Sequence, residues 1–152
     1  MHALIVVSHP LDTSLTHGVA AAIAEGITAA EPANTFEIAD LTQEGFDPVY
    51  GATDIAAFLK TASIPADILA EQKRIDSADA LVLVFPIYWW SMPALLKGWV
   101  DRVFLMVGLM KRRQRGQWSK NWGIYRCIWL LLGRQARAFM TVTALPMPLT
   151  RR

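Results

Sequence analysis

Two uninterrupted apolar runs constrain the fold of this 152-residue chain more than any other feature. The first covers residues 3–7 and the second covers residues 80–85. Neither run alternates between apolar and polar residues, so both are expected to be strands buried on both faces, as in a parallel sheet. A breaker stops each run, at Pro10 and at Pro86, and a helix-like segment follows. The sequence therefore predicts βαβ units and an α/β fold.

The remaining elements follow the same alternation of strand and helix. Helices are expected over residues 13–30, 65–77 and 93–104, with a weaker helix at 55–60 and a short strand at 35–38. Thr13 or Ser14 can cap the first helix and Ser91 the last, because their hydroxyls accept backbone N–H groups. This order predicts a doubly wound parallel sheet. Only three strands are evident, so the strand at 80–85 would form an exposed edge.

The composition is that of one soluble domain with a sizeable core. Hydrophobic residues make up 53% of the chain, and its single cysteine, Cys127, excludes an internal disulfide scaffold. No secretory leader is evident, and no apolar run is long enough to span a membrane. The expected location is therefore the cytoplasm, with no membrane span, and no metal site is predicted.

The charge is divided sharply along the chain. Residues 1–101 hold all 13 acidic residues and four of the 15 basic ones, for a net charge of −9. Residues 102–152 hold the other 11 basic residues and no acidic ones. The formal total of +2 thus hides an acidic body and a basic tail.

The first candidate ligand-binding segment is residues 8–16, between the first buried strand and its helix. Ligands of open α/β sheets bind outside the carboxyl ends of the strands, and a helix N-terminus there suits a phosphate. Thr13, Ser14 and Thr16 add hydroxyls, and His9 can add an imidazole N–H. The alternative is a plain turn in which Ser14 only caps the helix and His9 is exposed. No glycine-rich dinucleotide fingerprint is present.

The second segment is residues 85–93, at the carboxyl end of the second buried strand. Its adjacent Trp89 and Trp90 suit a planar ring, because exposed aromatic patches usually mark a contact site. Alternatively, these tryptophans pack under the first loop or at a subunit interface. A phosphate site and an aromatic site on one sheet edge together match the shape of a flavin nucleotide.

These motifs resemble those of a known family. The first strand with Ser8-His9-Pro10, the string Asp67 to Lys73, and the string from Phe85-Pro86 through Trp89-Trp90 to Asp101-Arg102-Val103-Phe104 are similar to the flavodoxin-like NAD(P)H:quinone oxidoreductases. Bacterial drug-activity modulators and potassium-efflux ancillary reductases belong to this group. The resemblance implies a flavodoxin-like fold, bound FAD or FMN, and two-electron reduction of a quinone by NAD(P)H. It also implies a homodimer.

The resemblance further assigns two sets of cofactor-binding residues. The flavin phosphates and ribityl chain would be held by His9, Thr13, Ser14, Leu15 and Thr16. The isoalloxazine ring would be lined by Pro86, Ile87, Trp89 and Trp90. Thr16 departs from the family pattern, in which Asn is common and reaches further.

The family pattern ends after Phe104, so the chain divides into a flavodoxin-like domain at 1–104 and a basic tail at 105–152. The family's fourth and fifth strands, glycine loop, and the Tyr and His near the nicotinamide and quinone are not evident there, so catalytic residues remain unassigned. Read one nucleotide out of register, the codons permitted by residues 106–111 can encode the family's Gly-Trp-Ala-Tyr, and those of 132–143 a glycine loop followed by Tyr and His. We therefore expect out-of-frame translation from about residue 105, an incomplete sheet and reduced activity.

A second function class rests on the tail alone. Its clustered Lys and Arg with interleaved tryptophans would suit nucleic acid or another anionic surface. The tail contains no recognisable binding module, and a frame slip produces such a composition without function. No nucleic-acid partner is therefore expected.

Overall fold

The structure is a computed structural model, and it describes residues 1–104, 128–132 and 139–142. The elements in chain order are β1 (His2–Val7), α1 (Leu15–Ala30), β2 (Thr35–Asp40), α2 (Ala52–Phe58), α3 (Ala66–Ser77), β3 (Ala80–Pro86), α4 (Ala94–Val103), β4 (Ile128–Leu132) and β5 (Phe139–Val142). Every helix and strand predicted in the first 104 residues is present. Within the described residues, no helix has the length and apolar character needed to cross a membrane.

The strands form one sheet in the order β2-β1-β3-β4-β5. β1 lies between β2 and β3 and is parallel to both, which confirms the predicted parallel core. β4 is parallel to β3, so the expectation that β3 forms an exposed edge is wrong. β5 runs antiparallel to β4, whereas a wholly parallel sheet would have a parallel last strand. The expected family strands are thus replaced by two short strands, and the rest of the tail lies outside the described residues.

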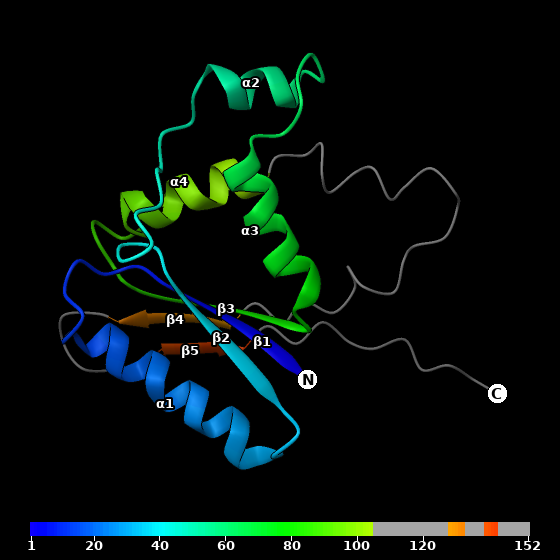
Figure 1. The fold of residues 1–152 in the computed structure, drawn as a ribbon. Coiled ribbons are helices and arrows are strands. Elements are labelled where there is room, and N and C mark those ends of the chain that lie inside the picture. The colour runs from blue at the N-terminus through cyan, green and yellow to red at the C-terminus, as the bar shows by residue number, and fades with distance from the viewer. Residues whose placement is uncertain (105–127, 133–138, 143–152) are drawn as a thin grey trace, which may run out of the picture.

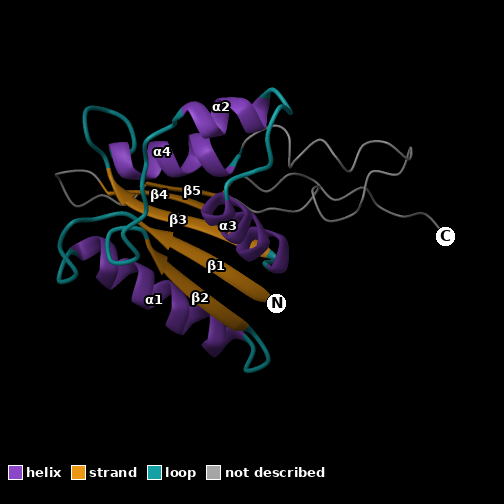
Figure 2. Ribbon diagram, turned by 45° about the horizontal axis from the view of Figure 1, so that its top comes forward, coloured by secondary structure: helices purple, strands orange, loops and turns teal. Residues whose placement is uncertain are grey.

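Helices cover both faces of the sheet (Figures 1 and 2). α1 lies on one face, and α3 and α4 lie on the other. Successive residues of β1 enter different cores: Leu4 and Val6 pack with α3 and α4, whereas Ile5 and Val7 pack with α1. This alternation explains why the run at 3–7 contains no polar residue, as predicted for a strand buried on both faces.

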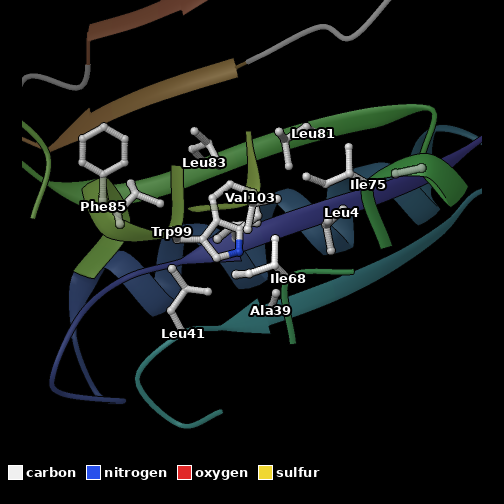
Figure 3. Close-up of a cluster of buried hydrophobic side chains, with 13 residues drawn as sticks. Leu4, Ala39, Leu41, Ile68, Ile75, Leu81, Leu83, Phe85, Trp99 and Val103 are labelled. Atoms are coloured by element: carbon white, nitrogen blue, oxygen red, sulfur yellow. The ribbon is translucent and has the colours of Figure 1, made fainter. Parts of the chain in front are cut away.

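Trp99 is the largest fully buried side chain of the core beneath α4 (Figure 3). Its indole Nε1 donates a hydrogen bond of 2.8 Å to Glu71 of α3, and its ring meets Phe104 edge-on with 5.8 Å between ring centroids. Gln72 of α3 also donates to the carbonyl of Val103 at 2.9 Å. These contacts fix α3 against α4, and the indole N–H gives a hydrogen-bond donor to Oε2 of the buried Glu71 carboxylate.

Arg102 of α4 joins three other segments. Its guanidinium is buried and forms ion pairs with Asp54 of α2 at 3.2 Å and with Asp67 of α3 at 3.0 Å. It also donates to the carbonyl of Asp47 at 2.7 Å and lies over the ring of Phe46, 5.6 Å from its centroid. Because a buried charge without partners is costly, Arg102 holds the loop after β2 and α2 onto the helical layer.

Arg74 of α3 performs a similar role at the margin of the molecule. It contacts Glu44 at 2.8 Å, Glu71 at 2.7 Å and Glu37 at 2.9 Å. Hydrogen bonds to Glu44 and then to Glu71 raise the pKa of the guanidinium above its ordinary value. The cluster ties α3 to β2 and to the loop that follows β2.

Gly98 marks the closest approach of that loop to α4. A Cβ atom at Gly98 would lie 2.2 Å from the carbonyl oxygen of Pro48, so only glycine fits without movement of the backbone. By contrast, a Cβ atom at Gly26, in the interior of α1, meets nothing within 4 Å.

We predict that Gly98→Ala lowers the free energy of unfolding by roughly 1 to 3 kcal/mol, because the methyl group must displace backbone. Gly26→Ala is the matched control and should raise it by about 0.5 to 1 kcal/mol through helix propensity. Urea unfolding followed by circular dichroism measures both changes. A Gly98→Ala protein as stable as the wild type would show that the loop does not pack on α4 as described.

Candidate functional site

The carboxyl ends of β1 and β3 lie side by side and bring the two predicted site segments to one edge of the sheet. Val7 pairs with Val84, and the Ser8 backbone N–H donates to the Val84 carbonyl at 3.2 Å. The loop from β1 to α1 and the loop from β3 to α4 leave the sheet at this edge (Figure 2). The prediction that both segments share an edge is confirmed.

Ser14 is the N-cap of α1, which settles the choice between Thr13 and Ser14 as the cap. Its hydroxyl accepts a hydrogen bond from the His17 backbone N–H at 3.4 Å. The first turn of α1 contains no acidic side chain, so the positive end of the helix dipole is not neutralised by the helix itself. The start of α1 therefore favours an anion electrostatically.

His9 is half-buried in the same loop and keeps one ring nitrogen for an outside partner. Its Nδ1 accepts a hydrogen bond from the Leu11 backbone N–H at 3.0 Å. Nδ1 also lies 3.1 Å from the Leu11 carbonyl oxygen. The proton of a neutral ring is therefore on Nε2 when Nδ1 accepts from the Leu11 N–H, and on Nδ1 when it donates to the Leu11 carbonyl. In the first of these tautomers, His9 supplies from Nε2 the imidazole N–H that the sequence predicts.

The other predicted residues of this loop differ in accessibility. Thr13 is exposed, and Leu15 is 67% exposed. Thr16 is only 2% exposed, which makes it the least accessible of the five predicted residues. A ligand at this loop would therefore meet Thr13, Ser14 and His9 before Thr16.

The second loop forms a tight turn around the two tryptophans. The backbones of Tyr88 and Ser91 exchange two hydrogen bonds, of 2.9 and 3.0 Å. Trp89 and Trp90 have φ angles of 49° and 62°, in the left-handed region that Gly or Asn usually occupies in such turns. Ser91 closes this turn, so its predicted role as helix cap is wrong. The N-cap of α4 is Pro93, which forms no side-chain cap bond.

Trp89 and Trp90 present their rings to the outside. They are 89% and 91% exposed, and their ring centroids lie 6.1 Å apart at an interplanar angle of 52°. The alternative that they pack under the first loop is therefore wrong. Pro86, the last residue of β3, and Ile87, which precedes this turn, are half-buried. The edge thus carries polar donors on one loop and an open aromatic surface on the other.

The sequence reasoning missed two residues of the site, His17 and Asp40. His17 Nδ1 lies 2.9 Å from the Ser14 hydroxyl oxygen, and His17 Nε2 lies 2.7 Å from Asp40 Oδ2. The spacing of Ser14 and His17, three residues apart at a helix start, is a signal for the first contact. No local pattern links Asp40, which reaches the site only because β2 pairs with β1.

Comparison with known proteins identifies the class. Residues 1–123 match the family described as having a flavodoxin-like fold, and the chain belongs to this family. It is 32% identical over 120 residues to NAD(P)H dehydrogenase [quinone] 1 of Cavia porcellus, an alignment that covers 67% of this chain and 42% of the relative. It is 30% identical over 142 residues to a Haemophilus influenzae protein named as an uncharacterized NAD(P)H oxidoreductase, covering 93% of this chain and 64% of the relative.

A solved structure gives the same result. The NAD(P)H:quinone oxidoreductase from Methanothermobacter marburgensis superposes with a TM-score of 0.66 at 33% identity, covering 70% of this chain and 55% of that one. The resemblance to flavodoxin-like quinone reductases expected from the motifs is confirmed. This chain spans about two fifths of the length of the Cavia porcellus relative.

We predict that Trp90→Gly leaves the free energy of unfolding unchanged or raises it by up to about 1 kcal/mol. Release of left-handed strain, about 1 to 2 kcal/mol, outweighs the extra chain entropy of glycine, and the exposed ring loses little packing. The contrasting variant is Trp99→Phe, which should cost roughly 1 to 3 kcal/mol because Glu71 loses its buried donor. Both values come from urea unfolding. Marked destabilisation by Trp90→Gly would show that this ring serves the fold.

Proposed function

We propose that this chain is a flavin-binding member of the NAD(P)H:quinone oxidoreductase lineage, which uses FAD or FMN to transfer two electrons from NAD(P)H to a quinone. The observation that carries the proposal is the pairing of the two loops at the carboxyl edge of β1 and β3. One loop offers hydrogen-bond donors at a helix N-terminus, and the other offers two exposed indole rings. The relatives named as quinone dehydrogenases support the same reaction.

The residues present fit the two ends of a flavin nucleotide. Ser14, His9 and the N–H groups at the start of α1 suit the phosphate, because they donate hydrogen bonds to an anion beside a positive dipole end. Trp89 and Trp90 suit the isoalloxazine ring, because a flat apolar surface gains most from a flat apolar partner. The strained turn that carries them is typical of a binding site, where backbone strain is retained for function.

The roles of the protein's own residues are binding and orientation. The loop after β1 holds the phosphate end and so fixes where the ring lies along the sheet edge. The turn at 88–91 presents the aromatic surface against which the ring is held, and Pro86 and Ile87 border it. A bound flavin would accept the hydride and pass the electrons on, since the cofactor supplies this chemistry and the protein supplies its position.

We also propose that the active form is a homodimer in which the partner subunit covers the tryptophans. Side chains that are 89% and 91% exposed leave the ring site open to water in a single chain. Exclusion of water strengthens polar interactions at the reacting atoms and protects against side reactions. A second copy placed over this edge would close the site.

We predict that the purified protein binds FMN or FAD and oxidises NAD(P)H only when a quinone is added. Ser14→Ala should weaken binding of the flavin by roughly 1 to 2 kcal/mol through loss of one hydrogen bond to the phosphate. Titration of each flavin, followed by quenching of its fluorescence, gives the affinities. Thr28→Ala is the matched control, since that hydroxyl bonds only to carbonyls within α1, among the described contacts, and lies at its other end.

Protein that binds neither flavin would contradict the proposed function. Equal flavin affinity of the wild type and Ser14→Ala would instead show that Ser14 serves only as a helix cap.

We further propose that residues 105–152 arise from out-of-frame translation of a longer family member. The absence of acidic residues after Asp101 supports this, because a folded segment normally mixes both signs of charge. We expect the coding DNA, read one nucleotide earlier from about codon 105, to remain open and to encode Gly-Trp-Ala-Tyr near codons 106–110. An early stop codon in that frame, or codons incompatible with those four residues, would refute the proposal.

A further inference from the structure

The flavin site proposed above includes a partly buried relay behind Ser14 that has no assigned role. Ser14, His17 and Asp40 form a chain of contacts from the start of α1 to the end of β2. The side chains of His17 and Asp40 are only 18% and 12% exposed, so water screens their interaction weakly. Ser14 is the N-cap of α1, where a phosphate would bind, whereas the ring of His17, in the first turn, contacts Asp40.

Asp40 fixes the protonation of one nitrogen of His17. Asp40 Oδ1 accepts backbone N–H groups of Thr42 and Gln43 at 3.0 and 3.2 Å, which fixes the orientation of the carboxylate. Its Oδ2 lies 2.7 Å from His17 Nε2 and can only accept there. His17 Nε2 therefore carries a proton, whatever the state of Nδ1.

The remaining nitrogen competes with a ligand for the single proton of the Ser14 hydroxyl. In a neutral His17, Nδ1 is an acceptor, so the 2.9 Å contact directs the Ser14 proton towards the ring. In a protonated His17, Nδ1 donates to the Ser14 oxygen instead. The Ser14 hydroxyl is then free to donate a hydrogen bond to a phosphate oxygen, and the imidazolium adds a positive charge nearby.

We infer that His17 is a positioning residue that couples binding of the flavin phosphate to uptake of a proton. The proton comes from solvent and is held at Nδ1 while the phosphate is bound; His17 acts through Ser14 and does not itself contact the ligand. Imidazole is suited to this role because it changes charge near neutral pH. The groups that face His17 among the described residues are Asp40 from β2, Ser14 on its own helix, and His9, whose ring lies edge-on at 6.3 Å between centroids.

The inference rests on the proposed function, and a phosphate-free ligand separates the two. Riboflavin has the same ring as FMN but lacks the phosphate, so it reports on the Trp89 and Trp90 surface alone. Dissociation constants for FMN and riboflavin are measured for the wild type, Ser14→Ala, His17→Gln and the double variant. Proton uptake on binding FMN is measured by calorimetry in buffers of different ionisation enthalpy.

We expect His17→Gln and Ser14→Ala each to reduce the preference for FMN over riboflavin by roughly tenfold, the size of one charge-assisted hydrogen bond. The double variant should lose no more than either single variant, because both act on one contact. Riboflavin affinity should be unchanged throughout. The His17→Gln variant should also take up fewer protons on binding FMN than the wild type. The phosphate's own change in protonation is common to both proteins, so it cancels from the difference.

His2 provides the matched control. Its Nδ1 also contacts a hydroxyl, that of Thr35 at 2.9 Å, but His2 begins β1 at the opposite end of the strand. His2→Gln should alter neither the FMN preference nor the proton uptake.

Additive losses in the double variant, or unchanged proton uptake in His17→Gln, would overturn the inference while leaving the proposed flavin site intact. A wild type that binds neither FMN nor riboflavin would overturn both. A parallel loss of FMN and riboflavin affinity in His17→Gln would show that His17 only maintains the loop, and would also overturn the inference.

Discussion

The parallel pairing of β1 with β3 is the constraint on which the rest of this molecule depends. Their register places Val7 beside Val84, so the two chain segments that follow must leave from the same edge. Both strands are buried on both faces, and a shift of one residue would move every side chain to the wrong core. The position of the site is therefore set by the same apolar contacts that stabilise the fold.

A second layer of polar contacts holds the supporting elements in place. Arg102 attaches α2 and the loop after β2 to α4, and Trp99 with Glu71 fixes α3 against α4. None of these groups belongs to the proposed site. They stabilise the helical layer that includes α4, the helix that follows the left-handed turn of Trp89 and Trp90.

The parts of this structure that depend on local pattern could be predicted from the sequence. The runs at 3–7 and 80–85 predicted buried strands because no polar residue interrupts them, and the shared edge of the two loops followed from parallel topology. The contacts of Asp40 could not be predicted, because they depend on the pairing of β2 with β1 rather than on neighbouring residues. The left-handed turn was equally hidden, since Tyr-Trp-Trp-Ser contains neither Gly nor Asn. β4 was missed because the apolar run at 128–132 lies beyond the point where the family pattern ends, in the segment interpreted as out-of-frame translation, and the direction of β5 depends on its distant pairing.

The central claim is that the two loops form one site for a single flavin nucleotide, and nuclear magnetic resonance on the 16.9 kDa protein tests it most directly. FMN is titrated into isotope-labelled protein while the backbone amide signals are followed. The account predicts that amides of residues 9–17 and 87–91 shift together and fit one dissociation constant. Shifts confined to one loop, two different dissociation constants for the two loops, or no shifts in either would contradict it.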